Sequence, residues 1–181
     1  NPESQTPERV IALQYNPDTV TRTLAPQAIP DAADRSSALR LKGAAVETIK
    51  LTAEIDATDR LEFPDLNAPA VESGIHRDLA ALEMLVHPRS DQLITNNTLA
   101  NLGTLEIAPI ETPLTLFVWS KLRIVPVRVT DLSITEEAFD PALNPIRAKV
   151  SLGLRVMSID DLTFSSKGGS LFIAYLQNKE R

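Results

Sequence analysis

Five carboxylates in a short stretch of the chain are the residues best suited to chemistry: Glu54, Asp56, Asp59, Glu62 and Asp65. Paired carboxylates can exchange protons in catalysis or bind calcium. The stretch lacks the glycine and the terminal glutamate of a calcium-binding loop, and Glu54 and Asp56 share the polar face of an expected strand. The pattern therefore favours a solvated or intersubunit acidic edge. An enzyme that uses the acidic cluster is an alternative from another class.

The other residue types that carry chemistry are sparse. The two histidines, His76 and His87, lie on one expected helix, where eleven residues separate them by roughly 16 Å, too far to share a metal ion. The chain has no cysteine and six scattered glycines, so it has no thiolate site and no phosphate-binding loop. We therefore expect no catalytic residue, no metal site and no cofactor, and we expect Glu54→Ala, Asp56→Ala or His76→Ala to affect assembly or nothing.

The strongest pattern in the chain lies at residues 125–156, where two runs of alternating residues flank a Pro-rich turn. Such a pattern is typical of a long β-hairpin. The second run places apolar residues on one face, namely Ile146, Ala148, Val150, Leu152, Leu154 and Val156. Its other face carries a basic stripe, Arg147, Lys149 and Arg155. The stripe lacks the interleaved aromatic residues that stack on bases, which favours a solvent face or a salt-bridged face.

The rest of the chain predicts mainly strands within one domain at residues 10–160. We expect strands at Val10 to Tyr15, Ala45 to Asp56 and Leu114 to Trp119, with the last of these opening a three-strand meander over residues 111–157. Residues 1–9 are expected to be flexible, residues 24–43 to form a long arm and residues 88–106 to form a polar connection. Trp119 is expected to be buried in the core.

Two segments favour helix. Residues 74–87 carry an apolar stripe at helical spacing, with Ser73 available as N-cap and Pro88 at the end. Residues 161–181 predict a flexible joint around Gly168 and Gly169, followed by a short amphipathic segment whose stripe is Leu171, Phe172, Tyr175 and Leu176. That stripe is too short to be a stable helix alone, so it should dock on the barrel or on a partner.

Four segments of the chain together resemble the tube-domain proteins of contractile injection systems, which are phage-tail-like particles with a sheath, an inner tube and a spiked baseplate. The most specific segment is the hairpin at residues 130–145, TDLSITEEAFDPALNP. The others are residues 47–59, ETIKLTAEIDATD, residues 14–17, QYNP, and residues 79–85, LAALEML, followed by Pro88. Their order and approximate spacing agree with that family over most of residues 10–157.

The resemblance implies a fold and a task. The fold is mostly β with one flanking α-helix, a tube-type β-barrel of two packed sheets whose subunits close into a homohexameric ring. The task is structural: an adaptor of the baseplate that joins the inner tube to the spike and initiates tube assembly, with the inner tube protein and spike, hub or other baseplate proteins as partners. Assembly would be cytoplasmic, in a particle that is either released or membrane-anchored. Several relatives carry a LysM module after the tube domain, for which the residues after the last expected strand are too few.

Candidate contacts within the ring or between rings are charged residues of the strands and of the hairpin turn: Glu54, Asp56, Glu136, Glu137, Asp140, Arg147, Lys149 and Arg155. For the three turn residues, Glu136, Glu137 and Asp140, a solvated tip is the alternative. The C-terminal stripe, namely Leu171, Phe172, Tyr175 and Leu176, is a candidate site for docking of a partner.

Composition limits the other classes of function. The formal net charge of −6 argues against a general nucleic-acid binder, and no apolar run is long enough to cross a membrane. Apolar residues make up 43% of the chain but aromatic residues only 4%, so the core should be aliphatic. Within the family, the alternative is an adaptor at the cap end of the tube. From another class, a small soluble ligand-binding β-barrel stays open, although the scarcity of aromatic residues counts against it.

Overall fold

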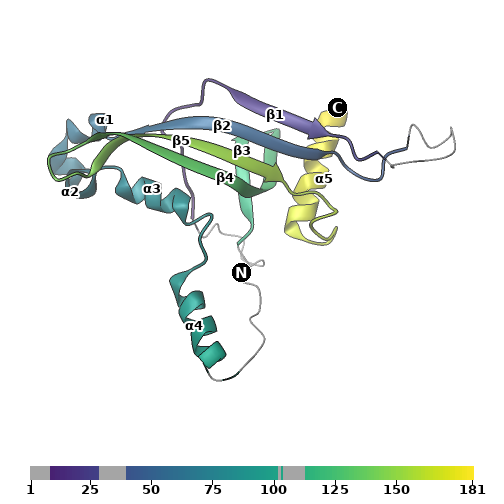
Figure 1. Ribbon diagram of the computed structural model, residues 1–181. Helices are drawn as coiled ribbons and strands as arrows, with labels where there is room; N and C mark the ends of the chain where they lie inside the picture. The colour runs from purple at the N-terminus through teal and green to yellow at the C-terminus, as the bar shows by residue number, and fades with distance from the viewer. Residues whose placement is uncertain (1–8, 29–39, 102, 104–112) are drawn as a thin grey trace.

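One antiparallel sheet dominates the computed structural model, which describes residues 9–28, 40–101, 103 and 113–181. Its five strands are β1 (Val20–Ala25), β2 (Val46–Asp56), β3 (Thr115–Ser120), β4 (Arg123–Phe139) and β5 (Pro145–Val156), in the order β1-β2-β5-β4-β3. The sheet is curled into a half-barrel (Figure 1). The mostly-β prediction is confirmed, whereas the described residues form one sheet and not the two packed sheets expected.

The central strands show the alternation that the sequence predicts. Ile49 pairs with Leu154, Leu51 with Leu152 and Ala53 with Val150, and all six side chains are buried on one face. Between these pairs lie polar ones, such as Glu54 opposite Lys149, on the other face. Because the side-chain period of a strand is two, the register places the whole apolar set on one side. Ile146, expected in the core, is half-buried because it lies near the hairpin end of β5.

Strand β4 is 17 residues long and is bent by irregularities in its pairing with β5, near Thr130 and Glu137. Bulges of this kind increase the local twist and bend of a strand. The turn at residues 121–122 joins β3 to β4, and the turn at residues 140–144 joins β4 to β5. The predicted meander is therefore confirmed, with a curvature that the alternation alone does not give.

The helices of the described residues are α1 (Thr58–Leu61), the 3-10 turn η2 (Pro64–Leu66), α2 (Ala68–Ser73), α3 (His76–Glu83), α4 (Ser90–Asn101) and α5 (Lys167–Glu180). Of these, α3 and α5 pack on the apolar face of the sheet. Ile75, Leu79 and Leu82 from the α3 region and Phe172 and Tyr175 from α5 complete one core with the strands. Figure 1 shows α3 and α5 on the same side of the sheet and α4 projecting away from it.

The number and bounds of the helices differ from the prediction of one flanking helix at residues 74–87. Gly74, at φ +57°, separates α2 from α3, and an added Cβ there would lie 2.0 Å from the carbonyl oxygen of Pro145. The hydroxyl of Ser73 donates to the Pro69 carbonyl within α2 and does not cap α3. The close approach of the β4–β5 turn therefore fixes this break, which helical periodicity cannot reveal.

Other local predictions need correction. Residues 10–15 form no strand but an irregular segment that bends at residues 14–15 and whose Ile11 and Leu13 pack against the core. Of the predicted arm at residues 24–43, residues 24–25 belong to β1, and an isolated bridge joins Ala28 to Leu41. Residues 29–39 of this arm lie outside the described residues. The same holds for residues 1–8 of the predicted flexible N-terminus. Within the predicted polar connection at residues 88–106, residues 90–101 are α4.

Candidate assembly surfaces

The basic stripe on β5 lies on the open face of the sheet and is paired within the chain. The guanidinium of Arg147 lies 2.7 Å from Asp56 and 3.8 Å from Glu54, both on β2. The ammonium of Lys149 lies 2.9 Å from Glu137 on β4, and Arg155 lies 2.9 Å from Asp161. The stripe is thus a salt-bridged face whose acidic partners lie on neighbouring strands and in the loop after β5.

Asp56 is the most enclosed charged residue of this face. Its carboxylate accepts hydrogen bonds from the Thr58 backbone N–H at 2.7 Å, from the Thr58 hydroxyl and from Arg147. Burial raises the pKa of Asp56, but these hydrogen bonds outweigh it and hold the pKa below its ordinary value. Asp56 therefore fastens the end of β2 to α1, which is a structural role.

The turn between β4 and β5 is built around Asp140. One oxygen of its carboxylate accepts from the backbone N–H groups of Ala142 and Asn144, and the other accepts from the Asn144 side-chain amide, each at 2.8 Å. Hydrogen bonding from Asn144 lowers the pKa of Asp140 below its ordinary value. The carboxylate of Asp140 thus has its hydrogen-bond partners within the turn, while Glu136, four positions earlier on β4, is exposed.

Leu143 is an exposed apolar residue of that turn. It has φ +66° and is 79% exposed. Only glycine, and to a lesser degree Asn and Asp, adopts this left-handed conformation without strain. A bulky apolar side chain is therefore held in solvent at a position where the fold alone would favour Asn or Gly.

The C-terminal stripe packs on the sheet of its own chain. Phe172 and Tyr175 are buried and Leu171 and Leu176 are half-buried. Gly168 and Gly169 lie in the first turn of α5, where the Ser166 hydroxyl accepts from the Gly169 N–H at 3.0 Å. An added Cβ on Gly169 would lie 2.3 Å from the Thr163 carbonyl oxygen, so these glycines allow close packing and are not the expected joint.

Glu47 is a buried acidic residue that the sequence-based prediction did not single out. It is 3% exposed on the apolar face of β2. Its carboxylate pairs with Arg22 of β1 at 2.6 Å and with Lys179 of α5 at 3.2 Å, and it accepts from the Tyr175 hydroxyl. Burial raises the pKa of Glu47, but these partners outweigh it and lower the pKa. The signal in the sequence was a charged residue at an apolar position of the β2 alternation, between Ala45 and Ile49.

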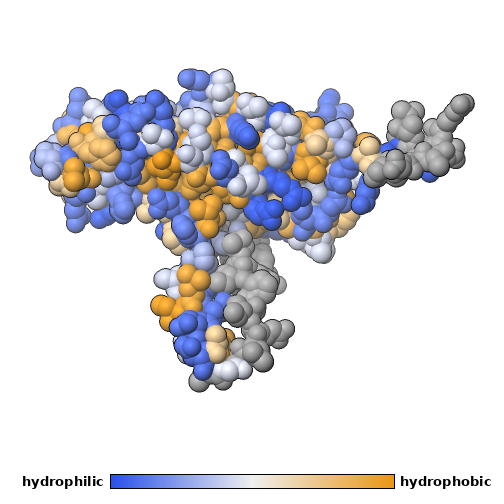
Figure 2. Space-filling model, viewed as in Figure 1, coloured by the Kyte–Doolittle hydropathy of each residue, from blue (hydrophilic) through white to orange (hydrophobic). Residues whose placement is uncertain are grey.

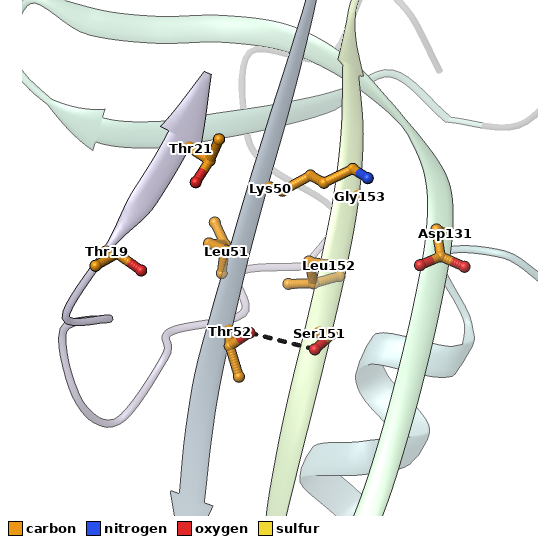
Figure 3. A pocket seen from close by; sticks show the side chains of 9 residues that line it. All are labelled: Thr19, Thr21, Lys50, Leu51, Thr52, Asp131, Ser151, Leu152 and Gly153. Atoms are coloured by element: carbon orange, nitrogen blue, oxygen red, sulfur yellow. Dashed lines mark hydrogen bonds between the residues drawn. The ribbon is translucent and has the colours of Figure 1, made fainter. Parts of the chain in front are cut away.

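A shallow groove of about 200 Å³ crosses the open face of the sheet where Gly153 lacks a side chain. Figure 3 shows Lys50 extending across Gly153 and the hydroxyls of Thr52 and Ser151 joined by a hydrogen bond of 3.2 Å. The remaining lining is Thr19, Thr21, Leu51, Asp131 and Leu152. The groove combines one cation, one carboxylate and hydroxyls without an enclosed volume.

The edges of the half-barrel are β1 and β3, the outermost strands among the described residues. Strand β3 exposes Leu116, Val118 and Trp119, with exposed fractions of 37%, 65% and 37%. The predicted burial of Trp119 is wrong: its ring stacks on Phe117, at 5.9 Å between centroids, on the same face of this edge strand. Exposed edges with apolar side chains are templates for pairing with another strand.

The acidic cluster and the histidines do not converge. Glu54 and Asp56 lie on β2, while Asp59, Glu62 and Asp65 are exposed on and after α1. His76 and His87 are exposed as well. Among the described residues no group of three or more acidic or histidine side chains could hold a metal ion.

The chain matches no protein-family model, and no curated protein is significantly similar to it. Among the helices of the described residues, none has the length and apolar character needed to span a membrane.

Proposed function

We propose that this protein is a ring-forming structural subunit of a contractile injection system, an adaptor that joins the inner tube to the spike and baseplate and initiates tube assembly. Two observations support it: the resemblance of the hairpin at residues 130–145, and a half-barrel whose outermost strands, β1 and β3, each pair with only one other strand among the described residues. The resemblance implies six copies in the ring. The same resemblance admits an adaptor at the cap end of the tube as the second candidate.

Edge strand β3 is the observation that carries the proposal. A soluble monomer normally protects its edge strands with charges, prolines or bulges. Here the outer residues of β3 are Leu116, Val118 and Trp119, and its one bulge lies at the end of the strand. Pairing of β3 with the β1 edge of a neighbouring copy would continue the sheet and cover both edges.

The open face of the sheet fits the wall of a channel. Its side chains include hydroxyls, as in Thr52 and Ser151, and charges such as the Arg147–Asp56 pair and Lys50. Such a surface does not bind apolar cargo tightly and stays hydrated. A ligand-binding barrel would need an enclosed apolar cavity. The groove at Gly153 opens to solvent instead, as does a second groove between residues 10–14 and helix α3. We propose that the protein has no enzymatic role, because the acidic and histidine side chains do not converge.

The test is the state of assembly of an edge variant. Val118→Lys places a charge on an edge side chain that is 65% exposed, so folding should be retained while ring formation is lost. Val86→Lys, at a 44% exposed side chain away from the edges, is the matched control. Ring formation would be read from particle micrographs and from sedimentation, with the tube and spike proteins of the same particle added. Rings of Val118→Lys as abundant as those of the wild type would refute edge pairing.

A further inference from the structure

Two exposed apolar patches of this chain carry opposite charge. We call the first patch the acidic end. It lies at the end of the sheet where the β4–β5 turn meets the segment from α1 to α2 (Figure 1). Five large apolar side chains are exposed there: Phe63, Leu66, Val71, Phe139 and Leu143. The Asn144 side chain donates to the Glu72 carbonyl at 3.3 Å, and Ile75 N–H donates to the Pro145 carbonyl at 2.8 Å. These bonds hold the two groups of segments together, and Figure 2 shows apolar atoms among charged ones at this end of the molecule.

The charge of the acidic end is one-sided. Residues 57–74 and 136–144, which build it, contain seven acidic residues and one basic residue, Arg60. Arg60 is paired with Asp78. In the described structure the exposed carboxylates of Glu62, Asp65 and Glu136 form no ion pair. An apolar centre with unpaired carboxylates around it fits a surface with an apolar centre and a basic rim.

The β3–β4 hairpin of the same chain has that composition. Residues 113–130 contain three basic residues, Lys121, Arg123 and Arg128, and no acidic residue. Leu122 at the turn is 67% exposed. Val118 and Trp119, four and three positions before it, are exposed as well. None of the three basic residues has an ion-pair partner within the described part of the chain. We call this patch the basic turn.

The two patches lie at opposite ends of one strand. Strand β4 begins at Arg123, in the basic turn, and ends at Phe139, in the acidic end. A strand of 17 residues spans roughly 50 Å at about 3.3 Å per residue when straight. The acidic end and the basic turn therefore cannot cover each other within one molecule, but they can do so between two.

We propose that the acidic end of one copy docks on the basic turn of a second copy, in a head-to-tail contact directed along β4. Apolar side chains form the centre of this contact and the unlike charges surround it, so that charge sets the orientation. The contact is heterologous, which means that each copy keeps one free patch and that copies add in series. It uses the ends of β4 and not the sheet edges, and it does not depend on the proposed role in an injection particle.

The experiment separates the two patches. One variant, Leu66→Ser with Leu143→Asn, removes the acidic end's two most exposed apolar side chains; the other, Leu122→Ser with Lys121→Ser, alters the basic turn. All are made in a Leu24→Lys background, at a 48% exposed side chain of edge strand β1 that lies outside both patches, so that edge pairing does not contribute. Circular dichroism verifies folding, and sedimentation velocity over a range of protein concentrations measures self-association.

The parent should self-associate, and increasing salt should weaken this association. Each variant alone should show a dissociation constant raised at least tenfold, whereas an equimolar mixture should form a species with one copy of each and nothing larger. Lys121→Glu alone should weaken association, while Lys50→Glu, an equal change of an exposed lysine on the open face, should not. A parent that stays monomeric at low salt, a variant that associates like the parent, or a mixture that does not associate would overturn the proposal.

Discussion

The hydroxyl of Tyr175 lies 3.0 and 3.1 Å from the two carboxylate oxygens of Glu47, although the two residues are 128 positions apart in the sequence. Arg22 donates to the same hydroxyl at 2.8 Å, and the Lys179 ammonium lies 3.9 Å from the centroid of the Tyr175 ring. One buried cluster therefore fastens β1, β2 and α5 together.

Tyr175→Phe should lower the free energy of unfolding by about 1–2 kcal/mol, because the buried carboxylate of Glu47 loses a donor while the ring packing is kept. Tyr15→Phe is the matched control, since its hydroxyl donates to Asp59 at 3.2 Å in an exposed site. Urea unfolding monitored by circular dichroism measures both. Equal losses in the two variants would show that burial of the Glu47 cluster contributes nothing to the effect.

Acid should destabilise the protein through Glu47. Its pKa is lower in the folded chain than the ordinary value of 4.5. Its contribution is therefore fully present above pH 4.5 and is lost as the pH falls through the lower, folded-state pKa. Glu47→Gln should be less stable than the wild type at neutral pH and should show a shallower loss of stability below pH 4.5. Parallel pH profiles for the two proteins would contradict this assignment.

The two glycines of α5 should respond differently to substitution. In Gly169→Ala the new Cβ would lie 2.3 Å from a backbone oxygen, whereas in Gly168→Ala it would meet the end of the Leu162 side chain. Gly169→Ala should cost about 1–3 kcal/mol by overpacking, and Gly168→Ala should cost less because Leu162 can move. Thermal unfolding compares the two. Equal stability of the two variants would contradict this prediction and would support the flexible joint that the sequence predicts.

Leu143→Asn should stabilise the isolated chain by about 0.5–1 kcal/mol, because Asn adopts positive φ at a lower cost than Leu. Leu66→Asn is the control at an equally exposed apolar residue outside the left-handed region. The same Leu143→Asn change should weaken the head-to-tail contact, so stability and self-association should move in opposite directions. A loss of stability would mean that Leu143 packs within its own turn.

Val150→Asp should prevent folding, because an unpaired charge in a fully buried site costs several kcal/mol. A soluble Val150→Asp protein that unfolds cooperatively would refute the burial of this face of β5.

Arg147→Glu should leave the fold intact but lower the midpoint of urea unfolding, since it places a carboxylate beside Asp56 and Glu54. Lys50→Glu is the control: Lys50 has no ion pair to lose within the described residues, so the midpoint should be unchanged.

The strands of the core, and the faces that they bury, follow from local sequence patterns. Alternation in β2 and β5 predicts which side chains are buried, because a strand has a side-chain period of two and only one of its faces meets the core. It also predicts a meander with a Pro-rich turn before its last strand, and the structure places the two turns of the meander at residues 121–122 and 140–144. These are local properties, so a single sequence suffices for them.

The ends of the sheet, and the contacts that fasten it to the helices, depend on residues far apart in the sequence. The break at Gly74 depends on the approach of Pro145, and the burial of Glu47 depends on Tyr175, a residue from the far end of the chain. The exposure of Trp119 follows from the edge position of β3, since an apolar residue in an alternating segment is buried only if another layer covers it. Contacts between distant segments leave no periodic signal, and for that reason local patterns predict the strands but not the edges, caps and clusters that they form.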